Sequence, residues 1–342
     1  MSLFDVKQNP AICVLPWVHE YKTITGKTAP CCQADNLGAT ETLESVREQM
    51  LQGIKPRVCG TCYINEQESN YSPRIQETVD WLKKFGEPDI NNPTLQFIDV
   101  RFDPTCNLKC KTCGPASSTL WQKEKKVSMP INADNMAYLS KVDKKKLNKV
   151  YLAGGEPTFI KGYLFFLQQL YEINPECEVI INTNLKKLPD PWKQIIKKFK
   201  NLTIVCSCDS IGLLGSYVRY PLRWKEFEEN VKFVSENANF LQFNLVASNL
   251  TAHKIFETCT WMKKFSNSIN IIILEEPDLF SERAVPYADR DVYIENIEKL
   301  QKFPVSVHYA LSFRNKIQYL LKRYHNSVYD EGLHKSLQAE II

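Results

Sequence analysis

The sequence predicts an α/β fold, a partial (β/α)6 barrel with a small cysteine-rich module before it and helices after it. Short runs rich in Val, Ile, Leu and Phe alternate with longer amphipathic segments, the pattern of a parallel sheet covered by helices. Five of the twelve cysteines gather in the first 62 residues. We therefore expect a cysteine-rich module at 1–90, a core barrel at 94–285 and a helical extension at 286–342.

Each barrel strand is predicted from one apolar run, and each covering helix from an amphipathic segment between two runs. The expected strands are 95–102, 149–153, 178–182, 202–208, 240–246 and 269–274. The clearest expected helices are 162–171, 192–199, 224–236 and 252–265. In such barrels, functional residues lie where the strands end. Near the C-terminus, Ile317, Leu320 and Leu321 form an apolar stripe at helical spacing, which predicts a packing helix.

Composition and charge narrow the class of protein. The net charge of +4 is small and has no basic stripe, which argues against a long nucleic acid as partner. No apolar run reaches membrane-spanning length, and the first residues lack the apolar core of a signal peptide, so we expect a cytoplasmic protein without a membrane partner. In a reducing compartment, clustered thiols indicate metal binding or catalysis rather than disulfides.

The segment that bears most on function is the loop after the first barrel strand, which contains Cys106, Cys110 and Cys113. Thiolates are ligands for iron–sulfur clusters and for zinc. Three ligands from one loop can hold three irons of a [4Fe-4S] cluster and leave the fourth iron open. Structural zinc sites use four ligands, so this C-x3-C-x2-C triplet favours iron–sulfur over a zinc loop or a chance spacing.

This triplet, placed after the first strand of a six-fold β/α array, resembles the signature of the radical S-adenosylmethionine (radical-SAM) superfamily over about residues 95–280. Gly154, Gly155 and Glu156 follow the second strand and resemble the segment that receives the SAM amino group; glycine permits close backbone approach and a carboxylate accepts from an ammonium. The segment 182–184, ending in Asn184, resembles the family's Thr-Asn-Gly, although Leu185 replaces the glycine.

The fourth strand ends in a Ser-x-Asp pattern that also matches the superfamily. Because strand side chains alternate, Ser207 and Asp209 share one face, and Cys206 and Cys208 share the other. The resemblance implies that Ser207 contacts SAM, that Asp209 faces SAM or substrate as the catalytic candidate, and that Arg219 pairs with the SAM carboxylate. The sequence departs from the family at position 112, which is threonine where an aromatic residue is frequent.

The resemblance implies a mechanism and its cofactors. SAM would chelate the open iron of the [4Fe-4S] cluster. One electron from a reductant such as flavodoxin or ferredoxin would cleave SAM to methionine and a 5′-deoxyadenosyl radical. That radical would abstract hydrogen from the substrate.

The N-terminal cysteines suggest a second metal site. Cys13, then Cys31 after a glycine turn, then Cys59 and Cys62 in a C-x2-C pair supply four thiolates. The spacing resembles the auxiliary-cluster modules called twitch and SPASM domains, which implies a second [4Fe-4S] cluster; a tetrahedral zinc site uses the same ligands. Cys32 is the spare thiol in this interpretation, because adjacent residues of an extended chain point to opposite sides.

The resemblance to modules of this kind favours a peptide or protein side chain as the substrate. A small molecule or nucleotide is the alternative for the same chemistry. A non-catalytic iron–sulfur or zinc scaffold is the alternative from another class, and the Gly-Gly-Glu-Pro and Ser-x-Asp segments count against it. Glu66, Glu68, Ser72 and Arg74 follow Cys62 and could either line a cavity or cap and pack helices.

Overall fold

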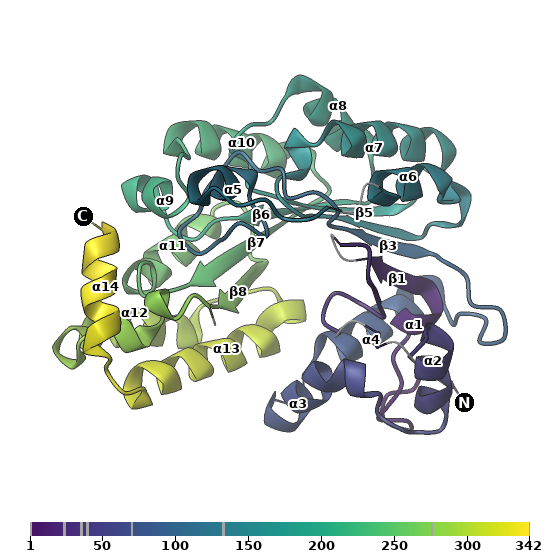
Figure 1. Cartoon of the computed structure of the whole chain (residues 1–342), viewed down its shortest axis with the longest axis horizontal. Helices are drawn as coiled ribbons and strands as arrows, with labels where there is room; N and C mark the ends of the chain where they lie inside the picture. The colour runs from purple at the N-terminus through teal and green to yellow at the C-terminus, as the bar shows by residue number, and fades with distance from the viewer. Residues whose placement is uncertain are drawn as a thin grey trace. The chain divides into compact units, whose positions relative to one another are not determined.

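The computed structural model describes residues 2–22, 25–34, 37–38, 41–69, 71–131, 134–274 and 276–341. In this part of the chain the strands follow the order β2-β1-β3-β4-β5-β6-β7-β8 (Figure 1). By its contacts the chain divides into two compact units, with the division falling inside β5. Unit 1 is residues 1–104, 129–180 and 199–201, and unit 2 is residues 105–128, 181–198 and 202–342.

The predicted α/β class is confirmed, and so are the predicted strands. They are β3 (Phe97–Val100), β4 (Lys149–Leu152), β5 (Glu178–Thr183), β6 (Leu202–Ser207), β7 (Phe240–Ala247) and β8 (Ile269–Ile273). β3 pairs with β4, β6 with β7, and β7 with β8, all in parallel. Parallel neighbours need crossover connections, and the amphipathic segments between the strands supply them as helices.

Unit 1 contains two short strands that the sequence did not predict. β1 (His19–Lys22) pairs in parallel with β3, and β2 (Thr28–Ala29) pairs antiparallel with β1. Each is too short to show a period-2 pattern, so packing rather than local sequence defines them. They attach the cysteine-rich segment to the edge of β3.

The helices of unit 1 form two groups. α1 (Leu15–Val18), α2 (Leu43–Leu51), α3 (Gly60–Ser69) and α4 (Pro73–Phe85) belong to the cysteine-rich segment. Trp17, Met50, Trp81 and Phe97 are in its apolar core. α6 (Asp134–Lys141) and α7 (Lys161–Ile173) lie together above β3 and β4 in Figure 1. Ser72 caps α4 by accepting the N–H of Ile75, and Gly86 ends that helix at a positive φ of +79°, which favours glycine.

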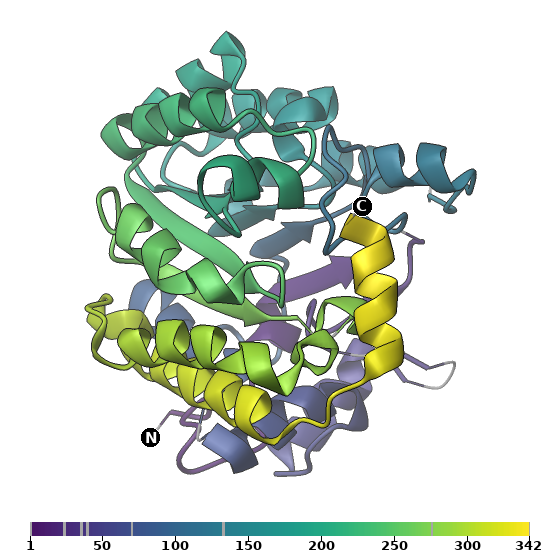
Figure 2. The same cartoon turned by 90° about the vertical axis from the view of Figure 1, so that its left-hand side faces the viewer.

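Unit 2 carries the remaining helices. They are α5 (Thr119–Lys125), α8 (Asp190–Lys198), α9 (Gly212–Val218), α10 (Trp224–Asn237), α11 (Ile255–Met262), α12 (Arg290–Glu298), α13 (Val307–Asn326) and α14 (Glu331–Ile341). The predicted stripe of α13 is confirmed, because Ile317, Leu320 and Leu321 are all buried. α13 packs on β8, as both views show (Figures 1 and 2). None of the helices that the structure describes combines the length and apolar character needed to cross a membrane.

Candidate functional site

The cysteine loop of unit 2 has no regular secondary structure. Its backbone is held by hydrogen bonds to neighbouring segments of the chain. The N–H groups of Lys109 and Lys111 donate to the carbonyls of Tyr220 and Val218 at 2.7 and 2.8 Å. The indole Nε1 of Trp121 donates to the carbonyl of Cys110 at 2.9 Å. A loop without secondary structure thereby has a defined path, which places its thiols.

The three thiols of the loop lie close enough to influence one another. Burial raises the pKa of Cys110 to about 12; the Arg219 guanidinium opposes this rise, and Asp209, Cys113 and Cys106 add to it. Burial also raises the pKa of Cys113. Since a thiol must lose its proton to bind iron, thiols in such surroundings need the positive charge of a metal to become thiolates.

Arg219 and Asp209 form a buried ion pair beside Cys110. Arg219 Nη1 donates to Asp209 Oδ2 at 2.8 Å, and Asp209 Oδ1 accepts the backbone N–H of Val246 at 3.0 Å. Both carboxylate oxygens of Asp209 therefore already accept a hydrogen bond, and this arrangement fixes the position of the Arg219 side chain. The Nε–H of Arg219 is buried and has no acceptor among the described residues, so a ligand carboxylate would fit it.

Asn184 connects the loop after β5 to the cysteine loop. Its Nδ2 donates to Asn107 Oδ1 at 2.9 Å and approaches Cys106 Sγ at 3.9 Å. Leu185, where the family has glycine, adopts φ +48°. Leu185 therefore adopts the positive φ that glycine favours, although it is a buried leucine. Ser207 donates to Asn182 Oδ1 at 3.1 Å.

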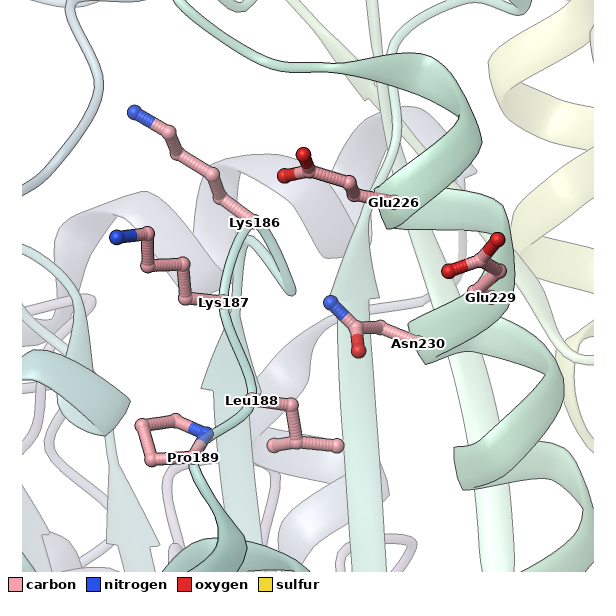
Figure 3. Close-up of a pocket in the computed structure, with 7 residues that line it drawn as sticks. All are labelled: Lys186, Lys187, Leu188, Pro189, Glu226, Glu229 and Asn230. Carbon is pink, nitrogen blue, oxygen red and sulfur yellow. The ribbon is translucent and has the colours of Figure 1, made fainter.

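Sequence reasoning missed Lys186 and Asn107. Lys186 Nζ donates to the carbonyl of Asn107 at 2.9 Å, so the cationic side chain braces the cysteine loop from the segment that carries Asn184. Asn107 follows Cys106 and Lys186 follows Leu185 in the sequence. This closeness to motif residues was the one sequence feature that could have pointed to them. The same lysine lines a groove of about 340 Å³. Figure 3 shows the groove, lined by Lys186, Lys187, Leu188, Pro189, Glu226, Glu229 and Asn230.

The prediction that Cys206 and Cys208 face helices agrees with their surroundings. Both are buried. Burial raises the pKa of Cys208 most, and the thiols of Cys206 and of Cys259, which lies on α11, raise it further.

The glycine-rich segment belongs to unit 1. Gly154 has φ +109°, and a Cβ there would lie 2.8 Å from the carbonyl oxygen of Asp103. The N–H of Gly155 donates to that same oxygen at 2.9 Å. Position 154 therefore requires glycine because the backbone of Asp103 lies too close for a side chain, whether or not a ligand binds there. Glu156 is fully buried and accepts from the N–H and hydroxyl of Thr158 at 3.0 and 2.5 Å.

The N-terminal thiols converge in unit 1. Burial raises the pKa of Cys13 to about 12, and Cys59 and Cys62 add to the rise. The pKa of Cys31 is raised well above its usual range by burial and then by Cys13, Cys32 and Cys62. Cys13, Cys31, Cys59 and Cys62 therefore share one region.

Cys32 points elsewhere. Burial raises its pKa to about 11, and its charged neighbours are Arg101, which opposes the rise, and Asp99, which adds to it. Arg101 donates from Nε and Nη2 to both oxygens of Asp99. The geometry supports Cys31 over Cys32 as the fourth member of the thiol set.

A buried hydrogen-bond network links the chain segment beside Cys13 to the segment that follows Cys62. Arg74 donates from Nε and Nη2 to Glu66 at 2.8 and 2.7 Å and from Nη1 to the carbonyl of Ile12. Ser72 donates to Glu66 and accepts from Ile75. Capping and packing therefore explain Glu66, Ser72 and Arg74; the side chain of Glu68 lies outside the described residues.

Among the described residues, no three His, Cys, Asp or Glu side chains are gathered as closely as a single metal ion requires. A tetrahedral zinc ion with bonds of about 2.3 Å needs its sulfurs in mutual contact. A [4Fe-4S] cluster binds each thiolate to a different iron, which spaces the sulfurs farther apart.

Comparisons with known proteins give distant relatives. No family model matches the chain. It is 30% identical over 109 residues to the GTP 3′,8-cyclase of Helicobacter pylori, covering 31% of this chain and 33% of that protein. It is 26% identical over 214 residues to the GTP 3′,8-cyclase of Nautilia profundicola, covering 61% of this chain and 65% of that protein. The chain thus spans less than two thirds of the length of these relatives.

These similarities and the cysteine loop agree on one superfamily. The chain shows a distant similarity to radical-SAM proteins. This similarity implies SAM and one [4Fe-4S] cluster, and the buried Nε–H of Arg219 beside Cys110 would fit an amino-acid carboxylate held at such a cluster.

Solved radical-SAM structures share the fold only loosely. anSMEcpe with bound AdoMet and the Kp18Cys peptide gives a TM-score of 0.44 at 16% identity, over 60% of both chains. Streptococcus suis SuiB gives a TM-score of 0.43 at 17% identity, over 62% of this chain and 47% of that one. Fits of this quality carry no argument about function.

Proposed function

We propose that the chain is an enzyme that reductively cleaves SAM and uses the resulting radical to modify a peptide or protein side chain. When bound, the cluster supplies the electron that splits SAM into methionine and a 5′-deoxyadenosyl radical, which takes hydrogen from the substrate. The observation that carries the proposal is the cysteine loop of unit 2 with a buried, partly unsatisfied arginine beside it.

The chain's own residues have distinct tasks in this proposal. Cys106, Cys110 and Cys113 hold three irons. Arg219 receives the SAM carboxylate through its fork of donors, and Asp209 fixes the orientation of Arg219. Asn184 sets the position of the loop near Cys106.

The remaining predicted SAM contacts are Gly154, Gly155, Glu156 and Ser207. The bend at Gly154 leaves no room for a side chain on the side of Asp103, and Glu156 caps the turn that follows. These groups would receive the amino nitrogen of SAM at the end of β4, and Ser207 would contact SAM at the end of β6.

For the N-terminal module we propose a second [4Fe-4S] cluster on Cys13, Cys31, Cys59 and Cys62, as in twitch and SPASM modules, with structural zinc as the alternative. The convergence of these thiols and the divergence of Cys32 support the ligand set. The domain boundaries 1–90, 94–285 and 286–342 are part of the same proposal.

A peptide substrate is proposed because of the resemblance of the N-terminal module to modules found in peptide-modifying relatives. A nucleotide or other small molecule is the second candidate, favoured by the similarity to GTP 3′,8-cyclases. The electron donor would be a flavodoxin or ferredoxin in the cytoplasm, acting as a one-electron reductant.

Anaerobic reconstitution tests the proposal. Iron and sulfide per chain are measured for the wild type and for the Cys106→Ala/Cys110→Ala/Cys113→Ala variant, and 5′-deoxyadenosine is assayed after dithionite reduction with SAM. We expect about eight irons in the wild type, about four in the variant, and deoxyadenosine from the wild type alone.

Other outcomes discriminate the alternatives. About four irons in the wild type and none in the variant would keep the enzyme and make the N-terminal site zinc or empty. Zinc without iron in competently reconstituted protein, with no SAM cleavage, would leave a scaffold.

A further inference from the structure

A row of uncharged polar side chains crosses the strands of unit 2 and ends at a lysine. Ser207 on β6 is the register partner of Asn244 on β7, which is the partner of Asn270 on β8. Asn270 Nδ2 donates to Asn244 Oδ1 at 3.0 Å. Lys316 Nζ, from α13, donates to Asn270 Oδ1 at 2.7 Å. The row thus links the strand end that carries the proposed SAM contact Ser207 to the C-terminal helix.

The face of β7 that holds this row is not the face that α11 covers. On β7 the residues alternate, with Leu241, Phe243 and Leu245 buried and the residues between them partly exposed. Phe243 packs against Trp261 of α11, so the buried face is the helix-covered one. Asn244 and Asn270 therefore project from the opposite face, where both retain access to solvent.

Amides on a half-open sheet face are unusual, because sheet faces that serve only for packing carry apolar side chains. Their donors and acceptors can pair with a bound molecule as well as with one another. Asparagine side chains present the same donor and acceptor groups as a peptide bond. Such a row suits a ligand that carries amide or similar hydrogen-bonding groups.

Lys316 is the charged end of the row and lacks an acidic partner among the described residues. Burial lowers its pKa to about 8. The neighbouring residue Ile317 is buried, and Lys322 on the same helix is exposed. The packing stripe of α13 thus places one ammonium group beside Asn270, where burial costs it solvation that a ligand anion would help to offset.

We infer that Lys316, with Asn270 and Asn244, forms a substrate subsite that binds an oxyanion, a carboxylate or a phosphate, flanked by amide-like hydrogen-bonding groups. The inference rests on the proposed function, since it places the substrate beside the strand end that carries Ser207. It adds the chemical class of group that the substrate must carry. A carboxylate would come from an acidic peptide and a phosphate from a nucleotide.

Competitive acetylation tests the subsite on the reconstituted protein. The acetylation rates of Lys316 and Lys322 are followed by peptide mass spectrometry at pH 7.5, with N-acetylaspartic acid amide, inorganic phosphate or neutral N-acetylasparagine amide present. A bound anion stabilises the ammonium form, which does not react. At about ten times the dissociation constant of the anion, we expect acetylation of Lys316 to slow about tenfold and that of Lys322 to be unchanged.

Protection by the carboxylate alone supports an acidic peptide, protection by phosphate alone supports a phosphorylated substrate, and protection by both supports a general oxyanion site. Equal acetylation of Lys316 in all three solutions overturns the inference. If the reagent does not reach Lys316, the increase in melting temperature caused by each anion decides: it should be present in the wild type and absent in Lys316→Met, and an equal increase in both overturns the subsite.

The assay separates this inference from the proposed function. Lys316→Met leaves both cysteine sets intact, so it should bind the same iron as the wild type and form deoxyadenosine in the absence of substrate. Absence of anion protection in a wild-type protein that still cleaves SAM sinks only the subsite. Anion protection in a protein that cleaves no SAM would sink only the proposed reaction.

Discussion

The two cysteine sets of this chain are held in different ways. The N-terminal set lies around a network in which the Arg74 guanidinium donates to both oxygens of Glu66 and to the carbonyl of Ile12, beside Cys13. The cysteine loop lies beside Arg219, whose Nε–H is buried without an acceptor. A satisfied arginine stabilises the fold, whereas an unsatisfied one at the same depth indicates a place for a ligand.

The largest effect on SAM binding should follow from changing the unsatisfied arginine. Arg219→Lys keeps a positive charge beside Asp209 but removes the Nε–H and the planar fork. We expect the dissociation constant for SAM, measured by equilibrium dialysis on the reconstituted protein, to rise more than about tenfold, the loss of one charge-assisted hydrogen bond. Arg223→Lys, at an exposed pair with Glu226, is the control. Unchanged SAM affinity in Arg219→Lys would contradict the role.

Iron content should separate two adjacent cysteines. Cys31 lies with the N-terminal thiols, and Cys32 lies with Asp99 and Arg101. We expect Cys31→Ala to lose up to about four irons per chain, the content of one cluster, and Cys32→Ala to lose none. Iron loss in Cys32→Ala with full iron in Cys31→Ala would reverse the assignment.

The satisfied arginine should show its effect in stability rather than in SAM binding. Arg74→Met leaves the Ile12 carbonyl without its donor and the Glu66 carboxylate with only the Ser72 hydroxyl, in a buried setting. Breaking a buried pair from one side costs about 3–5 kcal/mol, whereas Arg57→Met, at an exposed pair with Glu41, should cost much less. Urea unfolding of the two variants compares these losses, and equal losses would show that the network is not closed.

The smallest effect concerns the glycine-rich segment. Gly154→Ala places a Cβ 2.8 Å from the Asp103 carbonyl oxygen at a positive φ, whereas Gly53→Ala has a positive φ but no atom within 4 Å. Backbone strain alone costs about 1–3 kcal/mol, so Gly154→Ala should lose more unfolding free energy than Gly53→Ala. A similar loss in both would mean that the Asp103 backbone moves aside.

The sequence predicted those parts of the fold that depend on local pattern. The barrel strands, four of the helices between them and the stripe on α13 were evident because apolar periodicity marks them; the shorter helices α5, α6 and α9 were not predicted. β1 and β2 were not, because four and two residues carry too little pattern. Among site residues, the motifs pointed to Arg219 and Asp209 but not to their pairing with each other, which depends on the turn between β6 and α9 (Gly212–Val218). Lys316 was missed because only the three-dimensional packing of α13 brings it to Asn270.

Leu185 is constrained by two opposing requirements. Its φ of +48° favours glycine, while its side chain is fully buried and its carbonyl accepts from Asn230 on α10 at 2.9 Å. Replacing it with glycine would relax the backbone and leave a hole in the core; replacing it with a β-branched residue would fill the hole and worsen the backbone. Few single substitutions can satisfy both requirements, so this position should tolerate few replacements.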